Sequence, residues 1–443
     1  MLRKDSLQET DQPVANWLHQ RHRPAAIAAL VLLMACILGA TAYRIYSNYS
    51  HPGTSFDWTN RGFSDFHNGT FFPTQAFVDG KSPYSTIVAE EYNMARATPP
   101  YSPVLFLIHA PFAFFPLEIS RVIFFFFNFL WIAAIAYCSL SMSNQKFRWF
   151  DFLAITNLLL ISRPGHITMF SGYFTAEIVF GCFLALHYAK TRPALSGIGL
   201  VLASIKPNFV IPLVLLLVFR KNFHALIVGC FFCAASAGIG LGWLSYHNGL
   251  QQVVNDVRDG QEALHIDPTE MPVNTWTRVD LLGMYAKITD WAPDDKIYLA
   301  GMLVIVSLVG LVLWRASDRE TNSGATGLTG FIAILTLLLS LYHHSYDCLL
   351  LAVPAVGVLF FGRTTLPDVP TFSRYAVAIL TMIPIVNYTS TKSAMGLMSL
   401  KPLSFWWQAV TLVNGACLLA ALAILLFHAL NLKRTDAETV QIS

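Results

Sequence analysis

Apolar segments long enough to cross a lipid bilayer recur along this chain, and they constrain its fold more than any other feature. The first runs from Pro24 to Tyr43, about 20 residues, which is the length that a helix needs to span the hydrocarbon core. It follows the basic Arg21-His22-Arg23 and lacks a small-residue cleavage site, so we interpret it as an anchor and not as a signal peptide. Only 12% of the residues are charged, whereas soluble domains carry about 25%. The sequence therefore predicts an all-α polytopic membrane protein with a single integral domain, residues 1–443.

The apolar runs and their basic flanks predict about twelve transmembrane helices. Several of these are shorter than the ~17–25 residues of a straight span. The pairs 150–163/173–189 and 194–205/208–219 resemble broken or re-entrant hairpins, which a membrane tolerates where the backbone lines a protein cavity. The predicted spans are 24–46, 119–142, 150–163, 173–189, 194–205, 208–219, 223–246, 297–314, 326–342, 347–361, 374–389 and 405–430.

Basic residues indicate the orientation of these spans. Sixteen of the 29 lysine and arginine residues fall in the short segments that this threading places in the cytoplasm, as the positive-inside rule expects. Both termini are then cytoplasmic, and the long segments 47–118 and 247–296 are extracytoplasmic. We expect the proline-interrupted run 100–117 to form a helix lying on the outer face. The localisation that follows is a multi-pass protein of the plasma (inner) membrane.

The first outer segment, residues 47–118, is aromatic, rich in proline and glycine, and much longer than a tether requires. Long ordered loops usually carry function. Its most promising residue is Asp65, in Phe63-Ser64-Asp65-Phe66-His67. A structural alternative is that Asp65 caps a helix or is one surface acid among several. Function therefore depends on what lies near it.

Three further polar motifs interrupt apolar runs on the same predicted side of the membrane. They are Arg163-Pro164-Gly165-His166, Lys206-Pro207-Asn208 and His343-His344-Ser345-Tyr346-Asp347. Ionisable groups at membrane depth are costly and tend to mark sites or pathways. The alternatives are that Lys206 extends to the lipid headgroups, that Arg163 binds lipid phosphate and that one of the histidines is structural. Glu177, at the start of a predicted span, is interpreted as a buried polar contact.

Several classes of function are disfavoured by what the sequence lacks. The net charge of +3 is too small and too scattered to indicate nucleic acid binding. Cys230-x-x-Cys233 lies inside an apolar run without a partner pair, so we interpret both cysteines as buried apolar residues. His343 and His344 are adjacent and cannot share a helical face as metal ligands would. P-loop, Rossmann and GxSxG patterns are absent, and we expect neither a metal nor another cofactor.

The first outer segment resembles that of glycosyltransferase family 87, in which an Asp precedes a tyrosine/alanine helix, a G-x-x-PY element and a YPP-rich apolar sequence that ends in LP. Ser204-Ile205-Lys206-Pro207 is similar to the family's later KP element, and His343 to Asp347 resemble its late histidine-bearing loop. The family includes the mycobacterial phosphatidylinositol-mannoside mannosyltransferases. The matching elements here are Asp65, Phe71-Phe72-Pro73-Thr74-Gln75-Ala76-Phe77, Gly80-Lys81-Ser82-Pro83-Tyr84, Thr98-Pro99-Pro100-Tyr101-Ser102-Pro103 and Pro111 to Pro116.

This resemblance implies a C-type glycosyltransferase fold, with amphipathic surface helices in the first outer loop. It also implies transfer of a hexose, most simply mannose, or a pentose from a polyprenyl-phosphate donor to a lipid or glycan acceptor on the outer face. The family's Asp corresponds to Asp65, the expected general base, and its late His to His343 or His344. Membrane lipids are the remaining expected partners.

Other site residues are expected from charge and position. Positive charge would stabilise the phosphate of the leaving group, and Lys206 and then Arg163 are the expected contacts. We also expect Arg61, His67 and Tyr84 to contact substrate. Aromatic rings could stack on sugar, although packing is the simpler interpretation for them; the rings are those of Trp58, Phe66, Phe71 and Tyr84.

Two other classes stay open at this point. A lipid or glycolipid transporter also places charges at broken helices, but it predicts inverted repeats, and we find none in the sequence. A lipid-binding scaffold without catalysis predicts that neutralising Asp65 or His344 has no effect. The glycosyltransferase interpretation differs from both because it requires Asp65.

Overall fold

Helices form nearly all the regular structure in the described part of the chain. The computed structural model describes residues 23–53, 61–94, 101–266, 271–291, 293–320 and 324–432. Outside helices, its described β-structure consists of two isolated bridges, Tyr49 with Gly62 and Arg278 with His344. The all-α prediction is therefore confirmed for these residues. The predicted elements Trp58, Thr98-Pro99-Pro100 and the two chain ends lie outside them.

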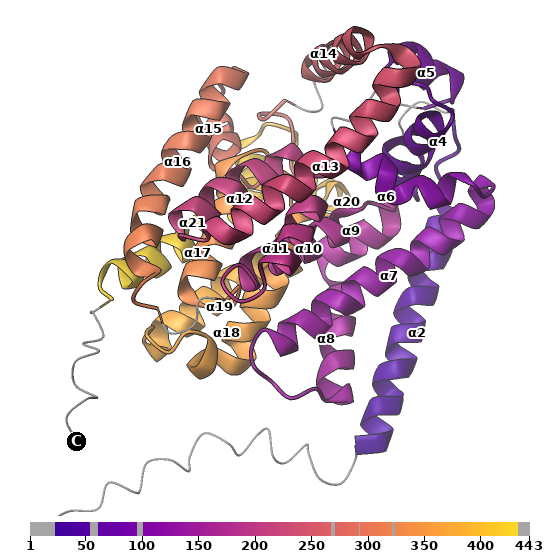
Figure 1. Ribbon diagram of the computed structural model, residues 1–443. Coiled ribbons are helices and arrows are strands. Elements are labelled where there is room, and N and C mark those ends of the chain that lie inside the picture. Colours follow the sequence, from indigo (N-terminus) through magenta and orange to yellow (C-terminus); the bar gives the residue numbers. More distant parts are fainter. Residues whose placement is uncertain are drawn as a thin grey trace, which may run out of the picture.

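Each predicted span coincides with a helical segment, with boundaries that differ by a few residues (Figure 1). These segments are α2 (Arg23–Ser47), α7 (Leu117–Ser141), α8 (Trp149–Ile161), α10 (Thr175–His187), α11 (Pro193–Ala203), α12 (Pro207–Phe219), α13 (Phe223–Asn248), α16 (Asp295–Ala316), α17 (Leu328–Ser340), the 3-10 helix η2 (Asp347–Leu351) continued by α18 (Ala352–Thr365), α19 (Thr371–Val386) and α21 (Phe405–Leu430).

Six of these segments are long and apolar enough to cross a membrane, namely α2, α7, α13, α16, η2 with α18, and α21. The others are apolar but shorter. A helix of 13 residues, such as α10, is about 20 Å long, whereas the hydrocarbon core is about 30 Å thick. The polytopic membrane class is thus supported by several spans, while the number twelve stays a prediction.

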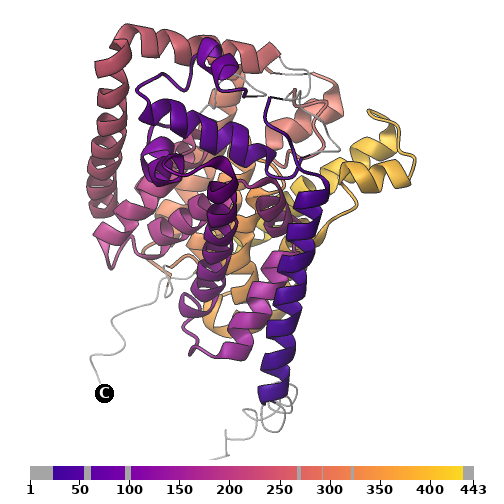
Figure 2. The same cartoon turned by 90° about the vertical axis from the view of Figure 1, so that its right-hand side faces the viewer.

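The remaining helices are short and belong mainly to the long segments between spans. They are α3 (Ser64–Phe66), the π-helix η1 (His67–Phe71), α4 (Phe72–Val78), α5 (Thr86–Glu91), α6 (Val104–Ala113), α9 (Arg163–Ser171), α14 (Leu250–Ile266), α15 (Leu281–Thr289) and α20 (Lys392–Leu397). Figures 1 and 2 show that α4, α5 and α14 gather at one end of the bundle, where α14 turns sharply from the end of α13. We call this end the loop face.

The first long segment is anchored to the loop face by side chains of α13. Trp243 Nε1 donates to the carbonyl of Phe77 at 2.8 Å, and Asn248 Nδ2 donates to the carbonyl of Gly80 at 2.9 Å. The helix predicted in 100–117 is present as α6. Its buried side packs on α4 and α13, so protein covers much of it.

Prolines and caps explain why the chain breaks at the polar motifs. Ser162 caps α9 by accepting from the Gly165 amide at 3.1 Å, and Gly172 ends α9 with a φ of 71°, which glycine adopts without strain. Pro207 opens α12, and the preceding Lys206 is extended, as residues before proline prefer. The two breaks place Arg163 and Lys206 at helix starts.

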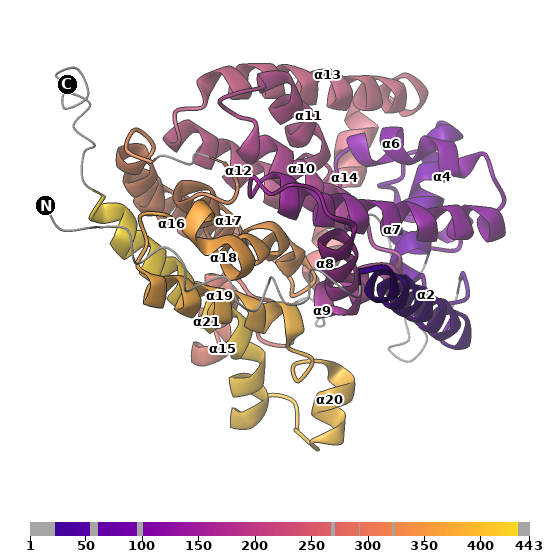
Figure 3. The ribbon, with the colours of Figure 1, turned by 90° about the horizontal axis from the view of Figure 1, so that it is seen from below.

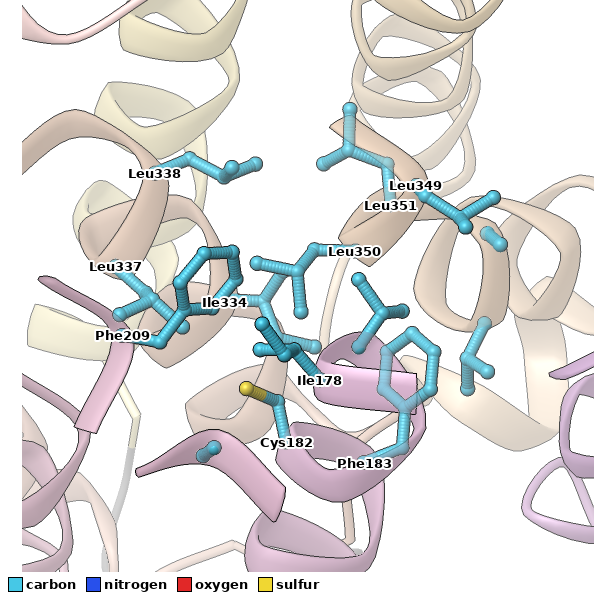
Figure 4. Packing of buried hydrophobic residues seen from close by; sticks show 14 of the residues in the cluster. Ile178, Cys182, Phe183, Phe209, Ile334, Leu337, Leu338, Leu349, Leu350 and Leu351 are labelled. Atoms are coloured by element: carbon cyan, nitrogen blue, oxygen red, sulfur yellow. The ribbon is translucent and has the colours of Figure 1, made fainter. Parts of the chain in front are cut away.

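Viewed along the bundle, α10 lies between a group that contains α2, α7 and α8 and a second group that contains α16 to α19 and α21 (Figure 3). Apolar side chains from α10, α12, α17 and η2 meet at the centre (Figure 4). Because η2 is completely buried there, the His343–Asp347 motif at its start enters the protein interior.

The prediction that Cys230 is buried is wrong, because Cys230 is exposed on α13. Cys233, one turn further along the same helix, is half-buried.

Candidate functional site

Backbone hydrogen bonds join segments that are far apart in the sequence and that carry or flank the polar motifs. Phe63 N donates to the Phe170 carbonyl at 2.9 Å, which joins the Asp65 segment to the end of α9. Ser102 N donates to the Ile205 carbonyl at 3.0 Å, next to Lys206. Backbone hydrogen bonds also join residues 277–279 to residues 343–345. These bonds bring the Asp65 segment to the end of α9, the first long segment to Lys206, and residues 277–279 to the His343–Asp347 motif.

Asp347 is the centre of this arrangement and is completely buried. Its Oδ2 lies 3.1 Å from His343 Nδ1 and accepts from the His344 amide at 2.9 Å. Its Oδ1 lies 3.9 Å from Lys206 Nζ. Since an ionised carboxylate only accepts, His343 Nδ1 carries the proton in this contact. We call Lys206, His343, His344 and Asp347 the polar cluster.

The two histidines differ in the hydrogen bonds that their ring nitrogens make. His344 Nδ1 lies 2.5 Å from Thr277 Oγ1, and its Nε2 lies 2.7 Å from the Tyr342 hydroxyl, so both ring nitrogens have hydrogen-bond partners. His343 Nε2 has no hydrogen-bond partner among the described residues and is buried. His343 is therefore the member of the pair with a nitrogen left for a ligand.

Lys206 lies in a box of aromatic rings. Its Nζ is 4.3 Å from the ring centroid of Tyr173 and 5.2 Å from that of Tyr346, with Phe174 and Phe209 further out. The side chain is only 7% exposed. Ring faces attract cations within about 6 Å, which stabilises a charge that has left water. The amine therefore does not extend to the headgroups.

Asp65 lies close enough to the polar cluster to act on it electrostatically. Burial lowers the pKa of Lys206, while the carboxylates of Asp347 and Asp65 counteract this. Burial raises the pKa of Tyr346, and Asp347 and Asp65 are among the neighbours that add to the rise. Asp65 itself is half-buried, so it combines access with proximity to Lys206.

The backbone around Asp65 is unusual. Phe63, two residues earlier, has a φ of 61°, a conformation that residues other than glycine rarely adopt. The chain then enters the short α3 and the π-helix η1, and π-helical turns frequently mark functional sites. A Cβ on Gly172 would lie 2.7 Å from Phe66 Cβ, so the α9 turn closely abuts the Asp65 segment.

Tyrosines connect the first loop to the aromatic box. The Tyr84 hydroxyl donates to the Tyr101 carbonyl at 2.8 Å, and the Tyr101 and Tyr173 hydroxyls are 2.9 Å apart. Tyr84 is buried, so its described contacts support Tyr101. Phe66 and Phe71 are also buried, and Phe66 stacks on Phe124 at 4.4 Å, which favours packing over sugar stacking for these rings.

His67 and Arg61 occupy other positions around the loop. His67 Nε2 lies 3.2 Å from the Tyr49 hydroxyl, and burial, with Arg121 nearby, lowers the pKa of His67 to about 3. His67 is therefore neutral at physiological pH and faces the end of α2. Arg61 is half-buried, and its carbonyl accepts from the Ser64 amide at 3.1 Å.

Arg163 takes part in a different set of contacts. It is buried, and its guanidinium donates to the carbonyls of Asn387 and Ser390 at 3.1 Å each and to the Ser390 hydroxyl. These bonds hold the segment between α19 and α20 against the start of α9. The structure thus places Arg163 apart from the Lys206 contacts, in a position that fixes a loop.

Two buried ion pairs have partners that were not predicted. Arg278 and Asp280 form a two-point pair with both distances 2.8 Å, directly beside the polar cluster. The prediction of a buried contact for Glu177 is confirmed, and its partner is His109 at 3.1 Å. The Arg278-x-Asp280 spacing was a visible signal in the sequence, whereas His109 and Glu177 are separated by too many residues to be paired by inspection.

The described residues contain no group of three or more His, Cys, Asp or Glu side chains placed to hold a metal ion. The arrangement instead offers a half-buried carboxylate, a caged amine and a histidine with one unbonded nitrogen, all within a helical membrane protein. Such a site suits proton transfer and stabilisation of negative charge.

Comparison with known proteins gives the class. A model of glycosyltransferase family 87 matches residues 100–340, more than half of the chain. The chain belongs to glycosyltransferase family 87, as its sequence motifs predict, and it is a membrane glycosyltransferase that uses a sugar donor and an acceptor. The matched region contains Arg163 and Lys206 and ends just before His343, while Asp65 precedes it. No curated protein and no solved structure matches the chain.

Proposed function

We propose that the protein transfers a sugar, a hexose such as mannose or a pentose, from a polyprenyl-phosphate donor to a lipid or glycan acceptor. The loop face is then extracytoplasmic, and Asp65 is the general base. The observation that supports this proposal is that the half-buried Asp65 carboxylate acts electrostatically on the buried Lys206 amine and raises its pKa. A carboxylate base and a cation in one site match a reaction that takes a proton from one oxygen and leaves negative charge on another.

In the proposed step, the acceptor oxygen forms a bond to the anomeric carbon of the sugar. The bond between that carbon and the phosphate oxygen breaks, and its electron pair leaves with the polyprenyl phosphate. Asp65 takes the hydroxyl proton as the oxygen attacks. A positioned general base contributes about 10²–10⁴-fold to such a rate.

The leaving phosphate needs positive charge more than it needs a proton. Lys206 supplies this charge, and the aromatic box keeps the amine in place. Asp347 acts as a positioning residue because it binds His343 Nδ1 and faces Lys206. With Nδ1 held in this way, His343 Nε2 is the atom that contacts the phosphate or relays a proton. The bonds of Arg163 to residues 387–390 favour a structural role for this arginine in place of the expected phosphate contact.

The test measures transfer of labelled sugar from polyprenyl-phosphate mannose, glucose and arabinose in vesicles that contain purified protein. Wild type, Asp65→Asn and Glu90→Gln are compared. Glu90 is an exposed acid of the same loop, so its substitution controls for loss of charge. We expect transfer by wild type and Glu90→Gln, and a loss of 10²-fold or more for correctly folded Asp65→Asn.

Two results would overturn the proposal. Full activity in Asp65→Asn would remove Asp65 as the base while leaving the enzyme class intact. Absence of transfer by wild type from all three donors, together with protein-dependent movement of a labelled lipid across the vesicle membrane, would favour the transporter alternative.

A further inference from the structure

Residues 387–404 connect α19 to α21, and we call them the lateral hairpin because they project sideways from the bundle (Figures 2 and 3). The segment contains α20 and then turns back, with Leu400 N donating to the Met395 carbonyl at 2.9 Å. Ser399 and Leu403 have φ values of 54° and 62°, which residues other than glycine rarely adopt. Such backbone conformations persist where the surrounding structure enforces them, so the hairpin has a defined shape.

The base of the lateral hairpin is fixed to the bundle. The Arg163 guanidinium donates to the carbonyls of Asn387 and Ser390 at 3.1 Å each. The Tyr388 hydroxyl donates to the Ile161 carbonyl at 2.6 Å. These bonds hold the base against the end of α8 and the start of α9, and the rest of the hairpin points away from the bundle (Figure 3).

Beyond this base, the hairpin and the first turn of α21 expose large apolar side chains. The exposed fractions are 89% for Leu397, 49% for Leu403, 72% for Phe405 and 68% for Trp406. Apolar side chains that gather on a surface in this way mark a site that contacts a membrane or another protein. The hairpin therefore needs a partner outside the bundle.

The position of the hairpin favours lipid as this partner. The helix that follows it, α21, is long and apolar enough to cross a membrane, and the hairpin ends where α21 begins. The ends of spans lie at the membrane boundary, where tryptophan is enriched, as at Trp406. Lipid-exposed backbone without helical hydrogen bonds does not occur in the hydrocarbon region, so the turns of the hairpin belong at the headgroup boundary. Because the hairpin extends sideways from the bundle, it stays at this level.

The charge of the hairpin indicates which headgroups it would contact. Lys392 and Lys401 are its only charged residues, and the sequence contains no Asp or Glu between Asp368 and Asp436. Lys401 is exposed, whereas the Lys392 amine lies 5.9 Å from the ring centroid of Trp276. Basic residues beside an apolar interfacial surface attract anionic lipids.

We propose that the lateral hairpin binds a lipid surface, namely the headgroup boundary of the leaflet nearer the loop face. Its apolar side chains insert among the lipids, and Lys401 binds an anionic phospholipid headgroup. This surface goes beyond the proposed transfer reaction, and its test needs no sugar donor.

The experiment measures how deep a spin label on the hairpin lies in the membrane. Leu397→Cys carries the nitroxide, in the full chain with its two exposed natural cysteines replaced, Cys36→Ala and Cys230→Ala. The protein is placed in vesicles of phosphatidylcholine and phosphatidylglycerol. Power-saturation EPR then compares collisions of the label with oxygen, which enters lipid, and with a water-soluble nickel chelate. The same background without a new cysteine corrects for labelling of the remaining natural cysteines.

Two reference positions calibrate the depth. Glu90→Cys, at an exposed position of the first long segment, is the reference for water, and Ile239→Cys, at an exposed position of α13, is the reference for the membrane interior. We expect the label at position 397 to lie between the two references, about 5–10 Å below the lipid phosphates. A label at position 403 should give the same result, so the outcome does not depend on one variant.

Two results would overturn the proposal. Labels at positions 397 and 403 that collide with nickel as often as the label at position 90 would place the hairpin in water. Dipolar broadening that disappears when labelled protein is diluted with unlabelled protein would show that a second copy of the chain covers the surface in place of lipid.

A second measurement tests the preference for anionic headgroups. A bimane fluorophore at position 397 is quenched by brominated phosphatidylglycerol or by brominated phosphatidylcholine, each diluted in unbrominated phosphatidylcholine. One lysine near an anionic surface changes the local affinity for such lipids by about fivefold, so Lys401→Gln should lower the preference for phosphatidylglycerol by about this factor. Lys296→Gln, at an exposed position at the start of α16, is the control and should leave the preference unchanged.

Equal quenching by the two lipids in protein that retains Lys401, or an unchanged preference in Lys401→Gln, would overturn the assignment of this lysine to anionic headgroups. Absence of sugar transfer by protein whose hairpin lies in the membrane would refute the proposed reaction and not this surface.

Discussion

The contact between Asp347 and Lys206 should contribute strongly to the free energy of unfolding. The two charges are 3.9 Å apart, and both side chains are buried. At an effective dielectric constant of about 20, their attraction is about 4 kcal/mol. Asp347→Asn removes this attraction and leaves a buried cation without its partner, a change that typically destabilises by about 3–5 kcal/mol. The new amide oxygen can still accept from both donors that now bind Oδ2, His343 Nδ1 and the His344 amide, but the amide NH₂ group then faces the Lys206 amine, and both of these groups are donors. We therefore expect a loss of about 3 kcal/mol or more.

The assay is reversible unfolding in mixed micelles with increasing SDS, followed by circular dichroism at pH 7. The measurement compares wild type, Asp347→Asn, Lys206→Met and the double variant. In the double variant, the Lys206 charge that Asp347→Asn leaves without a partner is also removed, which should recover part of the lost free energy of unfolding. The double variant should therefore be at least about 2 kcal/mol more stable than the sum of the single effects predicts. Asp290→Asn, which neutralises an exposed acid at the end of α15, should change stability by about 0.5 kcal/mol or less. A single-variant loss below about 1 kcal/mol, or additivity within about 0.5 kcal/mol, would refute the reasoning.

Two further predictions concern the segment around Asp65. Gly172→Ala should lower the thermal unfolding temperature and impair sugar transfer, because the new Cβ would lie 2.7 Å from Phe66 Cβ and the backbone φ of Gly172 is 71°. Gly396→Ala is the control and should be neutral, because Gly396 has open space around it. Equal behaviour of the two variants would contradict the close packing at Gly172. His67 has a folded-state pKa of about 3, below its unfolded value of about 6.5, so the unfolded chain binds the extra proton between these values and stability falls as the pH is lowered from 6.5 towards 3. The fall is roughly 1.4 kcal/mol per pH unit from this group, and His67→Gln should reduce the slope of stability against pH; an unchanged slope would show that His67 is protonated without penalty.

The sequence was a reliable guide to which segments are helical. Every predicted span coincides with a helix, and the breaks at Arg163 and Lys206 occur where proline and capping residues place them. These features are local, since an apolar run in lipid must satisfy its own backbone and proline restricts its neighbours. The family was also predicted from motifs alone, because the Asp65 segment, the KP element and the late histidine-bearing loop resemble those of its members, and the family model confirms it over residues 100–340.

The roles of individual polar residues depended on neighbours that are distant in the sequence. Arg163 was expected to bind donor phosphate, yet its guanidinium is bonded to residues 387–390, more than two hundred positions away. His343 and His344 could not be told apart by inspection, and their difference arises from Thr277 and Tyr342, which occupy both nitrogens of His344. The burial of Lys287 could not be predicted, because a lysine in a long polar segment ordinarily faces water.

The sequence by itself therefore determined the membrane class, the helical segments, the family and the set of polar motifs. Hydrophobicity and backbone restrictions act within a few turns of chain and can be read from neighbouring residues. Tertiary structure alone decided which of these motifs contact each other. It placed Asp347 between His343 and Lys206, and it buried the Lys287 amine without a hydrogen-bond partner among the described residues. Electrostatic partnership depends on distance in space and on the removal of water, and both are set only when helices from opposite ends of the chain pack together.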